Sequence, residues 1–289
     1  MAWQPSASIA ALTRRARLLG AIREFFAARD VLEVQTPVLG QFGVTDPDVP
    51  GIAVPDYGFL QTSPEYFMKR LLAAGMPDCY QLGPAFRDGE SGRLHNPEFT
   101  LLEWYRHDYD DQQLMAEVAE LVSVLLGPAD VATISYAELV FSDRYVAHPC
   151  AVDAPRDVLD LRFAEACRQL SPGRFFIVDY PADQAALARL RPAQDPAARF
   201  ELVIDGIEIA NGYWELVDAD EHERRFAQDN RLRAGRGLPS VEADPELLAA
   251  LRSGLPDCAG VAVGVDRLLM LVLQQPRIGA VMPFAWHSA

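Results

Sequence analysis

The sequence predicts an α+β fold in which helices pack on an antiparallel sheet. The stretches 80–106 and 199–215 are typical of antiparallel hairpins, because runs of strand-forming residues flank a polar loop or turn that contains glycine. The stretch 8–29 carries apolar residues at three- and four-residue spacing, as an amphipathic helix does. Strand–turn–strand units separated by helices favour the α+β class.

The predicted elements follow the chain in order. Ser8 is a plausible N-cap of the first helix, and the proline at 37 ends a short strand that begins at 31. Along the rest of the chain, the pattern predicts a loop at 46–56, helices at 65–74 and 111–126, a strand at 261–265 and a helix at 266–274. The stretch 145–195 has many prolines and alanines but no chemical motif, and we interpret it as a variable linker.

Length and composition narrow the class of protein. With 289 residues, half of them hydrophobic, the chain can bury one large core, so we expect a single domain over 1–289. Acidic residues outnumber basic ones by 41 to 26, and the net charge of −15 counts against a nucleic-acid partner.

The cysteines and the apolar segments indicate a cytoplasmic protein. No pair of cysteines has Cys-x-x-Cys spacing, so neither zinc nor a disulfide framework is expected. The four cysteines are Cys79, Cys150, Cys167 and Cys258. The first residues have no signal-peptide pattern, and no apolar run reaches membrane-spanning length.

The return strand of the first hairpin places a carboxylate among aromatic residues. Side chains alternate between the two faces of a strand, so Glu103 shares a face with Phe99 and Tyr105. Because Arg87 and His95 lie in or beside the loop, this hairpin is a candidate site. The alternative is a surface hairpin with ordinary salt bridges.

The second hairpin brings two carboxylates together. A turn at Asp205-Gly206 predicts that Val203 opposes Glu208 and that Glu201 opposes Ala210. The two glutamates then share a face at roughly 7–8 Å. Such a pair can hold Mg²⁺, a cation that prefers oxygen ligands and often shares them with phosphates. The alternative is two glutamates on a solvated face.

Four motifs in order resemble the class II aminoacyl-tRNA synthetases, and in particular the lysine enzyme. They are 31–37 for motif 1, 86–87 with 95–99 and 103–105 for motif 2, 208–215 for the amino-acid-binding strand, and 260–267 for motif 3. The resemblance is closer still to the truncated paralogues that attach β-lysine to elongation factor P, as the stretches 3–9, 238–240 and 254–258 indicate.

The resemblance implies a fold and partners. The implied fold is the class II catalytic fold, a six-stranded antiparallel sheet flanked by helices. Motif 1 implies a homodimer. Motif 1 arrives by residue 31, so we expect no N-terminal anticodon-binding domain and no tRNA partner.

The implied activity is that of an AMP-forming ligase. It activates (R)-β-lysine or lysine with ATP and Mg²⁺ and transfers it to a lysine side chain of elongation factor P. Arg87 and Arg267 are the implied catalytic residues, and Glu201 and Glu208 the metal ligands. The implied ATP-binding residues are Arg87, Asp88, Gly89, Glu90, His95, Asn96, Phe99, Glu208, Ile209, Gly264 and Arg267.

A lysine-like substrate brings two ammonium groups, which need counter-charges if they are buried. The implied amino-acid-binding residues are Ser63, Pro64, Glu65, Glu103, Tyr105, Ala210, Asn211 and Glu215. Glu65 could instead be a helix-start glutamate favoured by the dipole, and Glu103 and Glu215 could be structural ion-pair partners. Ala210 replaces a glycine of the synthetase, and we hypothesise that its methyl group favours a β-amino acid.

One departure from the family pattern concerns the adenine contact. The synthetases have Arg-x-Glu, whereas Arg87 is followed by Asp88, Gly89 and Glu90. Either Glu90 reads the adenine from a shifted loop, or backbone groups of Asp88 and Gly89 do.

Two other functions are compatible with these motifs. One is a synthetase-like enzyme that delivers its adenylate to another acceptor, such as a tRNA or a free amine. The other is a non-catalytic regulatory paralogue, against which the presence of both arginines and both metal-site glutamates counts.

Overall fold

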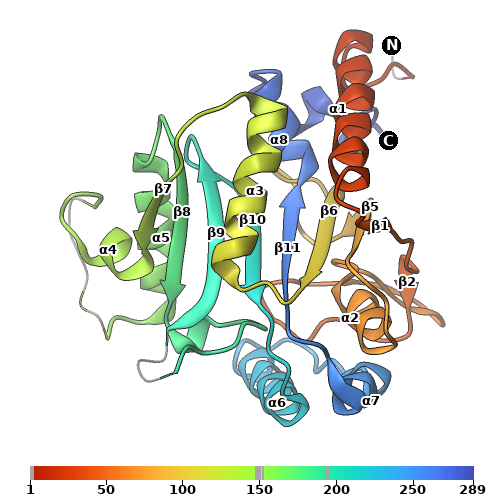
Figure 1. Ribbon diagram of the computed structural model, residues 1–289, viewed down its shortest axis with the longest axis vertical. Coiled ribbons are helices and arrows are strands. Elements are labelled where there is room, and N and C mark those ends of the chain that lie inside the picture. Colours follow the sequence, from red (N-terminus) through yellow and green to blue (C-terminus); the bar gives the residue numbers. More distant parts are fainter. Residues whose placement is uncertain (1–2, 147–150, 152, 193–195) are drawn as a thin grey trace. The chain divides into compact units, whose positions relative to one another are not determined.

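The computed structural model describes residues 3–146, 151, 153–192 and 196–289, so Cys150 and part of the predicted linker lie outside the described residues. The chain divides into two compact units (Figure 1). The first unit comprises Met1–Asp108, Val217–Asp257 and Val263–Ala289, and the second comprises Tyr109–Leu216 and Cys258–Ala262.

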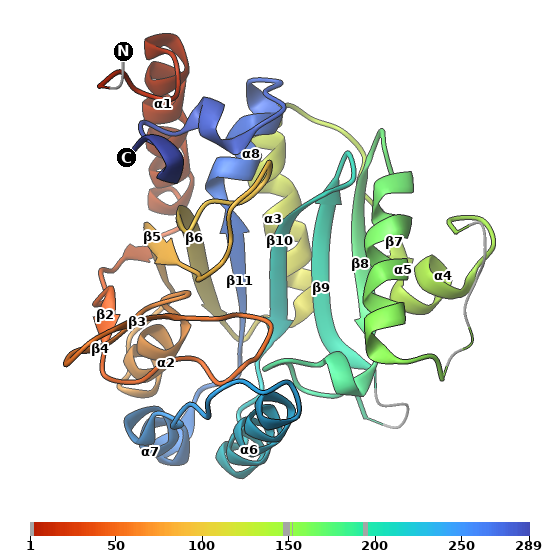
Figure 2. The same cartoon turned by 180° about the vertical axis from the view of Figure 1, so that it is seen from behind.

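The first unit contains three complete strands of the larger sheet, a small second sheet and most of the helices (Figure 2). Its helices are α1 (Ile9–Ala27), α2 (Glu65–Ala73), α6 (Ala219–Gly235), α7 (Pro245–Gly254), α8 (Val265–Val272) and the 3-10 helices η2 (Ile278–Val281) and η3 (Trp286–Ser288). Its strands are β1 (Leu32–Glu33), β2 (Leu39–Gly40), β3 (Ile52–Val54), β4 (Gly58–Leu60), β5 (Cys79–Phe86) and β6 (Glu98–His107). The predicted N-cap is confirmed, since Ser8 Oγ accepts a hydrogen bond from Ala11 N at 3.1 Å.

The described residues of the second unit form three α-helices and four complete strands. They are α3 (Asp111–Leu126), β7 (Ala132–Ser135), α4 (Tyr136–Phe141), α5 (Arg156–Gln169), β8 (Arg174–Tyr180), β9 (Ala197–Ile204) and β10 (Ile207–Trp214), with the 3-10 helix η1 (Ala182–Gln184). The strand β11 (Cys258–Gly264) begins in this unit. Helix α3 contacts β9 and β10, and its predicted bounds are confirmed.

The main sheet has eight strands in the order β1-β5-β6-β11-β10-β9-β8-β7. The α+β class is confirmed, but the predicted six antiparallel strands are corrected to a mixed sheet. Strand β1 pairs in parallel with β5, and β7 pairs in parallel with β8. Both are short edge strands without a hairpin turn, so the local pattern did not reveal them. The stretch interpreted as a linker supplies α5 and β8.

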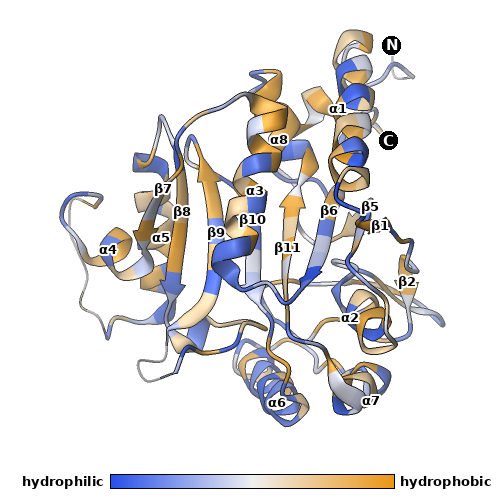
Figure 3. Ribbon diagram, viewed as in Figure 1, coloured by the Kyte–Doolittle hydropathy of each residue, from blue (hydrophilic) through white to orange (hydrophobic). Residues whose placement is uncertain are grey.

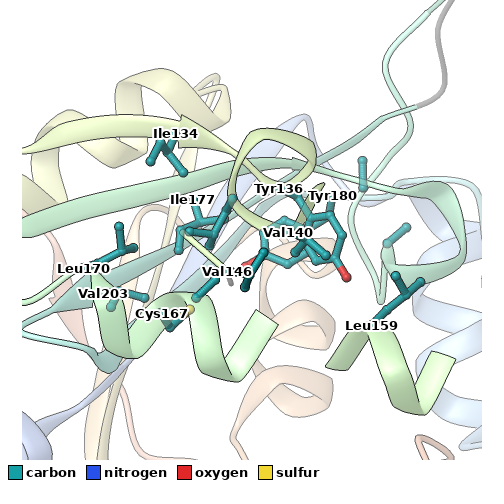
Figure 4. Close-up of a cluster of buried hydrophobic side chains, with 14 of the residues drawn as sticks. Ile134, Tyr136, Val140, Val146, Leu159, Cys167, Leu170, Ile177, Tyr180 and Val203 are labelled. Atoms are coloured by element: carbon teal, nitrogen blue, oxygen red, sulfur yellow. The ribbon is translucent and has the colours of Figure 1, made fainter. Parts of the chain in front are cut away.

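A cluster of buried apolar side chains lies in the second unit. Figure 3 shows β8 and β9 as largely hydrophobic, which suits strands buried on both faces. The rings of Tyr136 and Tyr180 lie 5.2 Å apart in the core cluster of Figure 4, which also contains Ile177 and Val203. This core supports β9, the strand that carries Glu201.

A β-bulge in β10 corrects the predicted register of the second hairpin. Val203 opposes Glu208 as predicted, but Ala210 then pairs with Leu202, and Asn211 pairs with Glu201. The shift lies between Glu208 and Ala210. Because the bulge adds one residue to one strand only, it moves Asn211 onto the face of the two glutamates.

Replacing Gly212 by alanine is expected to destabilise the protein by about 1–3 kcal/mol, the usual cost of overpacking. A Cβ at this position would lie 2.4 Å from the Phe200 ring, which is fully buried. Gly235→Ala is the matched control, because a Cβ there meets nothing within 4 Å. Urea denaturation measures both, and equal stability of the two variants would contradict the expectation.

Helix α6 is largely hydrophilic (Figure 3), yet it buries His222. His222 Nδ1 lies 2.9 Å from the carbonyl oxygen of Asp218, and its ring packs edge-on to Phe226. Burial, together with the nearby Lys69 ammonium, lowers the pKa of His222 to about 3. The folded protein therefore holds this histidine neutral.

Replacing His222 by glutamine is expected to flatten the acid side of the stability profile. Between about pH 6.5 and pH 3 the unfolded chain binds a proton at His222 that the folded protein does not bind. The contribution of His222 to the free energy of unfolding is therefore constant above about pH 6.5. Below this pH, the free energy of unfolding falls by up to about 1.4 kcal/mol for each pH unit. Urea denaturation at pH 7, 6 and 5 measures the slope, and an unchanged slope in His222→Gln would refute this origin.

None of the helices in the described part of the chain is both long enough and apolar enough to cross a bilayer.

Candidate active site

The loop between β5 and β6 is closed by backbone contacts. Arg87 N donates to the carbonyl oxygen of Pro97 at 2.9 Å, which brings the two ends of the loop together. Inside the loop, the Asp88 carboxylate accepts from Gly89 N at 2.9 Å, and Gly89 has φ +71°, a conformation that suits glycine. The predicted hairpin over 80–106 is confirmed, with Gln81 opposite Glu103.

The Arg87 guanidinium has a donor that makes no hydrogen bond to the described residues. Its guanidinium carbon lies 5.1 Å from the centre of the Phe99 ring, and the nearest carboxylate oxygen, of Glu90, is 3.7 Å from Nη1. Its Nε is buried and has no hydrogen-bond partner among the described residues. A buried donor without a partner costs free energy, so this side chain is suited to an anionic ligand.

Arg267 is held against the same loop. Its Nε lies 3.3 Å from the carbonyl oxygen of Leu94, and its Nη2 lies 2.6 Å from His95 Nε2. A guanidinium can only donate, so His95 Nε2 is the acceptor and the imidazole is neutral, with its proton on Nδ1. Arg267 and His95 therefore form one unit at the base of the loop.

Asp266 anchors the helix that carries Arg267. Its buried carboxylate accepts from Thr100 N at 2.6 Å and pairs with Arg15 of α1 at 2.5 Å. Arg15 also donates to the Thr100 hydroxyl at 2.5 Å. These contacts fix α8 on β6, so the position of Arg267 depends on a buried ion pair that sequence reasoning missed.

Asn96 is already engaged within the chain. Its Nδ2 donates to the carbonyl oxygen of Glu98 at 2.6 Å, and its Oδ1 accepts from Trp286 N at 2.8 Å. The buried amide therefore ties the loop to the C-terminal segment. Its predicted contact with ATP is untested and would compete with these two bonds.

The predicted amino-acid residues of the first unit lie on α2 and β6. Glu65 is the first residue of α2 and pairs at 2.7 Å with Lys69, which is fully buried. Ser63 Oγ accepts from Glu65 N at 3.3 Å. Tyr105 donates its hydroxyl proton to the buried Glu103 carboxylate at 2.8 Å. The shared face predicted for Glu103 and Tyr105 is thus confirmed.

The predicted metal ligands lie in the second unit. Glu201 and Glu208 are on the same face of the β9–β10 hairpin, since Glu208 opposes Val203. Glu201 is buried and accepts from Arg199 Nη2 at 2.5 Å, whereas Glu208 is exposed. Burial raises the pKa of Glu201 to about 7, with Glu208 adding to the rise and Arg199 opposing it. Two carboxylates on one face of a hairpin provide the oxygen ligands that a hard cation prefers.

Among the described residues, no group of three or more His, Cys, Asp or Glu side chains forms a complete metal site. The glutamate pair would therefore bind Mg²⁺ together with other oxygen atoms, such as those of a nucleotide triphosphate.

The β-bulge determines on which face of β10 the remaining predicted residues lie. Asn211 lies on the Glu201 face, whereas the Ala210 methyl group lies on the opposite face with Leu202. The predicted substrate contact of Ala210 is untested and stays a prediction. Ile209 and Glu215 are both buried. Their roles stay predictions, as does that of Gly264 at the N-cap of α8.

Sequence reasoning missed the side chains that hold the predicted residues. These are Arg15, Lys69, Arg199, Tyr213 and Asp266. Arg199 had a usable signal, because it stands two residues before Glu201 and therefore shares its face. Lys69 also had one, as the i+4 partner of Glu65.

Comparison with known proteins decides the family. The family model for class II tRNA synthetases (D, K and N) matches residues 4–288. The chain belongs to this family. Elongation factor P–(R)-β-lysine ligase of Yersinia pestis (strain Pestoides F) is 45% identical over 99% of this chain and 98% of its own length. The ligase of the same name from Yersinia pseudotuberculosis serotype O:1b (strain IP 31758) matches to the same extent. The class II motifs quoted from the sequence thus lie in a chain that matches this family along nearly all its length.

Proposed function

We propose that the protein activates (R)-β-lysine with ATP as an aminoacyl adenylate and transfers the β-lysyl group to a lysine side chain of elongation factor P. The structural observation that carries this proposal is Arg87, a partly buried guanidinium with an unused donor beside an aromatic ring. The names of the Yersinia relatives support the choice of substrate and acceptor.

In the first step, a carboxylate oxygen of β-lysine forms a bond to the α-phosphorus of ATP, and pyrophosphate leaves. The reaction needs positioning and charge stabilisation rather than covalent help from the protein. Arg87 donates to the α-phosphate oxygens, since its planar fork matches them. Arg267 binds the nucleotide, and His95 holds the Arg267 guanidinium in place.

Mg²⁺ supplies charge neutralisation on the phosphates. Glu201 and Glu208 are the residues that would hold it. Arg199 helps to keep Glu201 ionised, because its positive charge opposes the effect of burial on the pKa of Glu201.

The amino-acid subsite supplies a counter-charge for each ammonium group of β-lysine. Glu65 and Ser63 receive the amine nearer the carboxylate, and Glu215, Tyr105 and Asn211 receive the distal amine. Both Glu103 and Glu215 are buried. A buried ammonium group needs such a counter-charge, because burying an uncompensated charge is costly.

In the second step, the ε-amine nitrogen of the acceptor lysine attacks the carbonyl carbon of the adenylate. An amide bond forms, AMP leaves and the amine loses a proton. The acceptor should present basic residues around its lysine, because the enzyme carries a net charge of −15. We further propose that the protein is a cytoplasmic homodimer that does not use tRNA.

The decisive experiment offers the purified enzyme, ATP and Mg²⁺ either α- or β-lysine, with elongation factor P as acceptor. Intact-mass spectrometry should show elongation factor P heavier by one β-lysyl group, and a variant lacking the acceptor lysine should stay unmodified. Pyrophosphate exchange without this mass shift, or label on tRNA, would point to another acceptor. Absence of exchange with either amino acid would overturn the adenylate chemistry itself.

A further inference from the structure

Arg199 on β9 contacts three different acceptors with three different nitrogens. Its Nη2 donates to Glu201 Oε1 at 2.5 Å, its Nε to Asn211 Oδ1 at 3.3 Å, and its Nη1 to the Gln184 carbonyl oxygen at 2.7 Å. Its guanidinium carbon lies 4.3 Å from the centre of the Tyr180 ring. The side chain is 14% exposed. It is therefore fixed from several sides within the second unit.

The register of the hairpin explains why one arginine can reach both partners. Asn211 pairs with Glu201, and Tyr213 pairs with Arg199, so all four side chains share one face. Without the bulge before Ala210, Asn211 would lie on the other face. Arg199 thus donates hydrogen bonds both to Glu201 on its own strand, β9, and to Asn211 on the neighbouring strand, β10.

The chemistry of the guanidinium also fixes the orientation of Asn211. Arginine has donors only, so the carbonyl oxygen of the Asn211 amide faces Nε. The amide nitrogen then faces Tyr213, and it donates to the Tyr213 hydroxyl oxygen at 3.2 Å. Each amide group of Asn211 therefore has a defined direction in the absence of any substrate.

We propose that Arg199 is a positioning residue that builds the cation subsite at Glu201 and the amino-acid subsite at Asn211 as one rigid array. This inference rests on the proposed function, because it assigns Glu201 to a divalent cation and Asn211 to a lysine-like substrate. Arg199 itself contacts neither ligand. It acts by holding one carboxylate oxygen and one amide oxygen in fixed directions.

The alternative is that Arg199 only stabilises the fold as a buried ion pair. The two roles differ in what a conservative variant does. Arg199→Lys keeps the positive charge, but a single ammonium group cannot reproduce the three directions of the fork. A structural role predicts lower stability with normal ligand affinities, whereas a positioning role predicts that both affinities fall together.

The test titrates Mn²⁺ by electron paramagnetic resonance in the presence of a non-hydrolysable ATP analogue, and β-lysine by calorimetry. In Arg199→Lys both dissociation constants should rise by about tenfold or more, as for other residues that support ligands. Tyr213→Phe removes the hydroxyl that accepts a hydrogen bond from Asn211. It should raise the β-lysine constant by about fivefold and leave the Mn²⁺ constant unchanged.

Arg191→Lys is the matched control, because Arg191 pairs with the buried Asp111 and with Asp179 in the same unit. It should change stability but neither affinity. If Arg199→Lys changes the Mn²⁺ constant by less than twofold, or moves one affinity only, the inference is overturned. If the wild-type protein bound no lysine and catalysed no exchange, the proposed function would fail, and the Mn²⁺ titration would still decide whether Arg199 acts on Glu201.

Discussion

Replacing Arg87 by alanine should lower the rate of ATP–pyrophosphate exchange by about 10³-fold, because a donor aimed at developing phosphate charge is worth about 10²–10³ in rate. Arg87→Lys should recover only a small part of this loss, since lysine lacks the planar fork. The loss should appear mainly in kcat, because the interaction strengthens as pyrophosphate leaves. Exchange at saturating ATP measures it.

Arg70 provides a close control for this prediction. Its guanidinium carbon lies 5.7 Å from the Phe67 ring, and its Nη1 is 3.8 Å from Asp244, much like the contacts of Arg87 with Phe99 and Glu90. Arg70 has no place in the proposed chemistry. Arg70→Ala should therefore keep full exchange activity, and comparable losses in both variants would argue against a catalytic role for Arg87.

The second large effect is expected at the glutamate pair. Glu208→Gln should lower exchange by about 10²-fold and raise the Mg²⁺ concentration needed for half-maximal rate by about tenfold. Glu208 is exposed, so the variant should keep its stability. Titrating Mg²⁺ at saturating ATP separates loss of cation binding from loss of chemistry.

Glu201→Gln should show the same Mg²⁺ signature together with lower stability, because it leaves the Arg199 charge buried without a counter-charge. Glu165→Gln is the control in the same unit, since Glu165 forms a partly exposed ion pair with Arg162 at 3.0 Å. Normal Mg²⁺ dependence in both Glu201→Gln and Glu208→Gln would show that these two glutamates do not bind the cation.

The parts of the fold with strong local patterns could be predicted from sequence. The helix capped at Ser8, the helix at 111–126 and the two hairpins all appear where the periodicity and the turn residues placed them. The strands β7 and β8 were missed, because they pair in parallel across α4 and α5 and so are not joined by a hairpin turn. The glycine at 212 indicates a bulge or a close backbone approach in this strand, but it lies beyond the observed shift between Glu208 and Ala210, so the register after Glu208 could not be predicted from it.

The candidate site, too, could be predicted only in part from the sequence. Motif spacing predicted residues for ligand binding, such as Arg87 and Glu201, and these roles stay predictions. It did not identify the residues that orient them, because Arg15 and Asp266 lie 251 positions apart in the chain and meet only in the folded protein. Such pairs have no local pattern.

The extra residue in β10 has a consequence for how this strand can change during evolution. Which side chains of β10 share a face with Glu201 depends on the number of residues between them and Glu208 and on the bulge that accommodates Ile209. Deletion of Ile209 would remove the bulge and still leave Asn211 opposite Glu201. Insertion of one residue beside Ile209 would instead place Ala210 opposite Glu201 in a single event, whereas point substitutions would have to rebuild the face one position at a time. Insertions should therefore be tolerated in the loops around this strand but not within it.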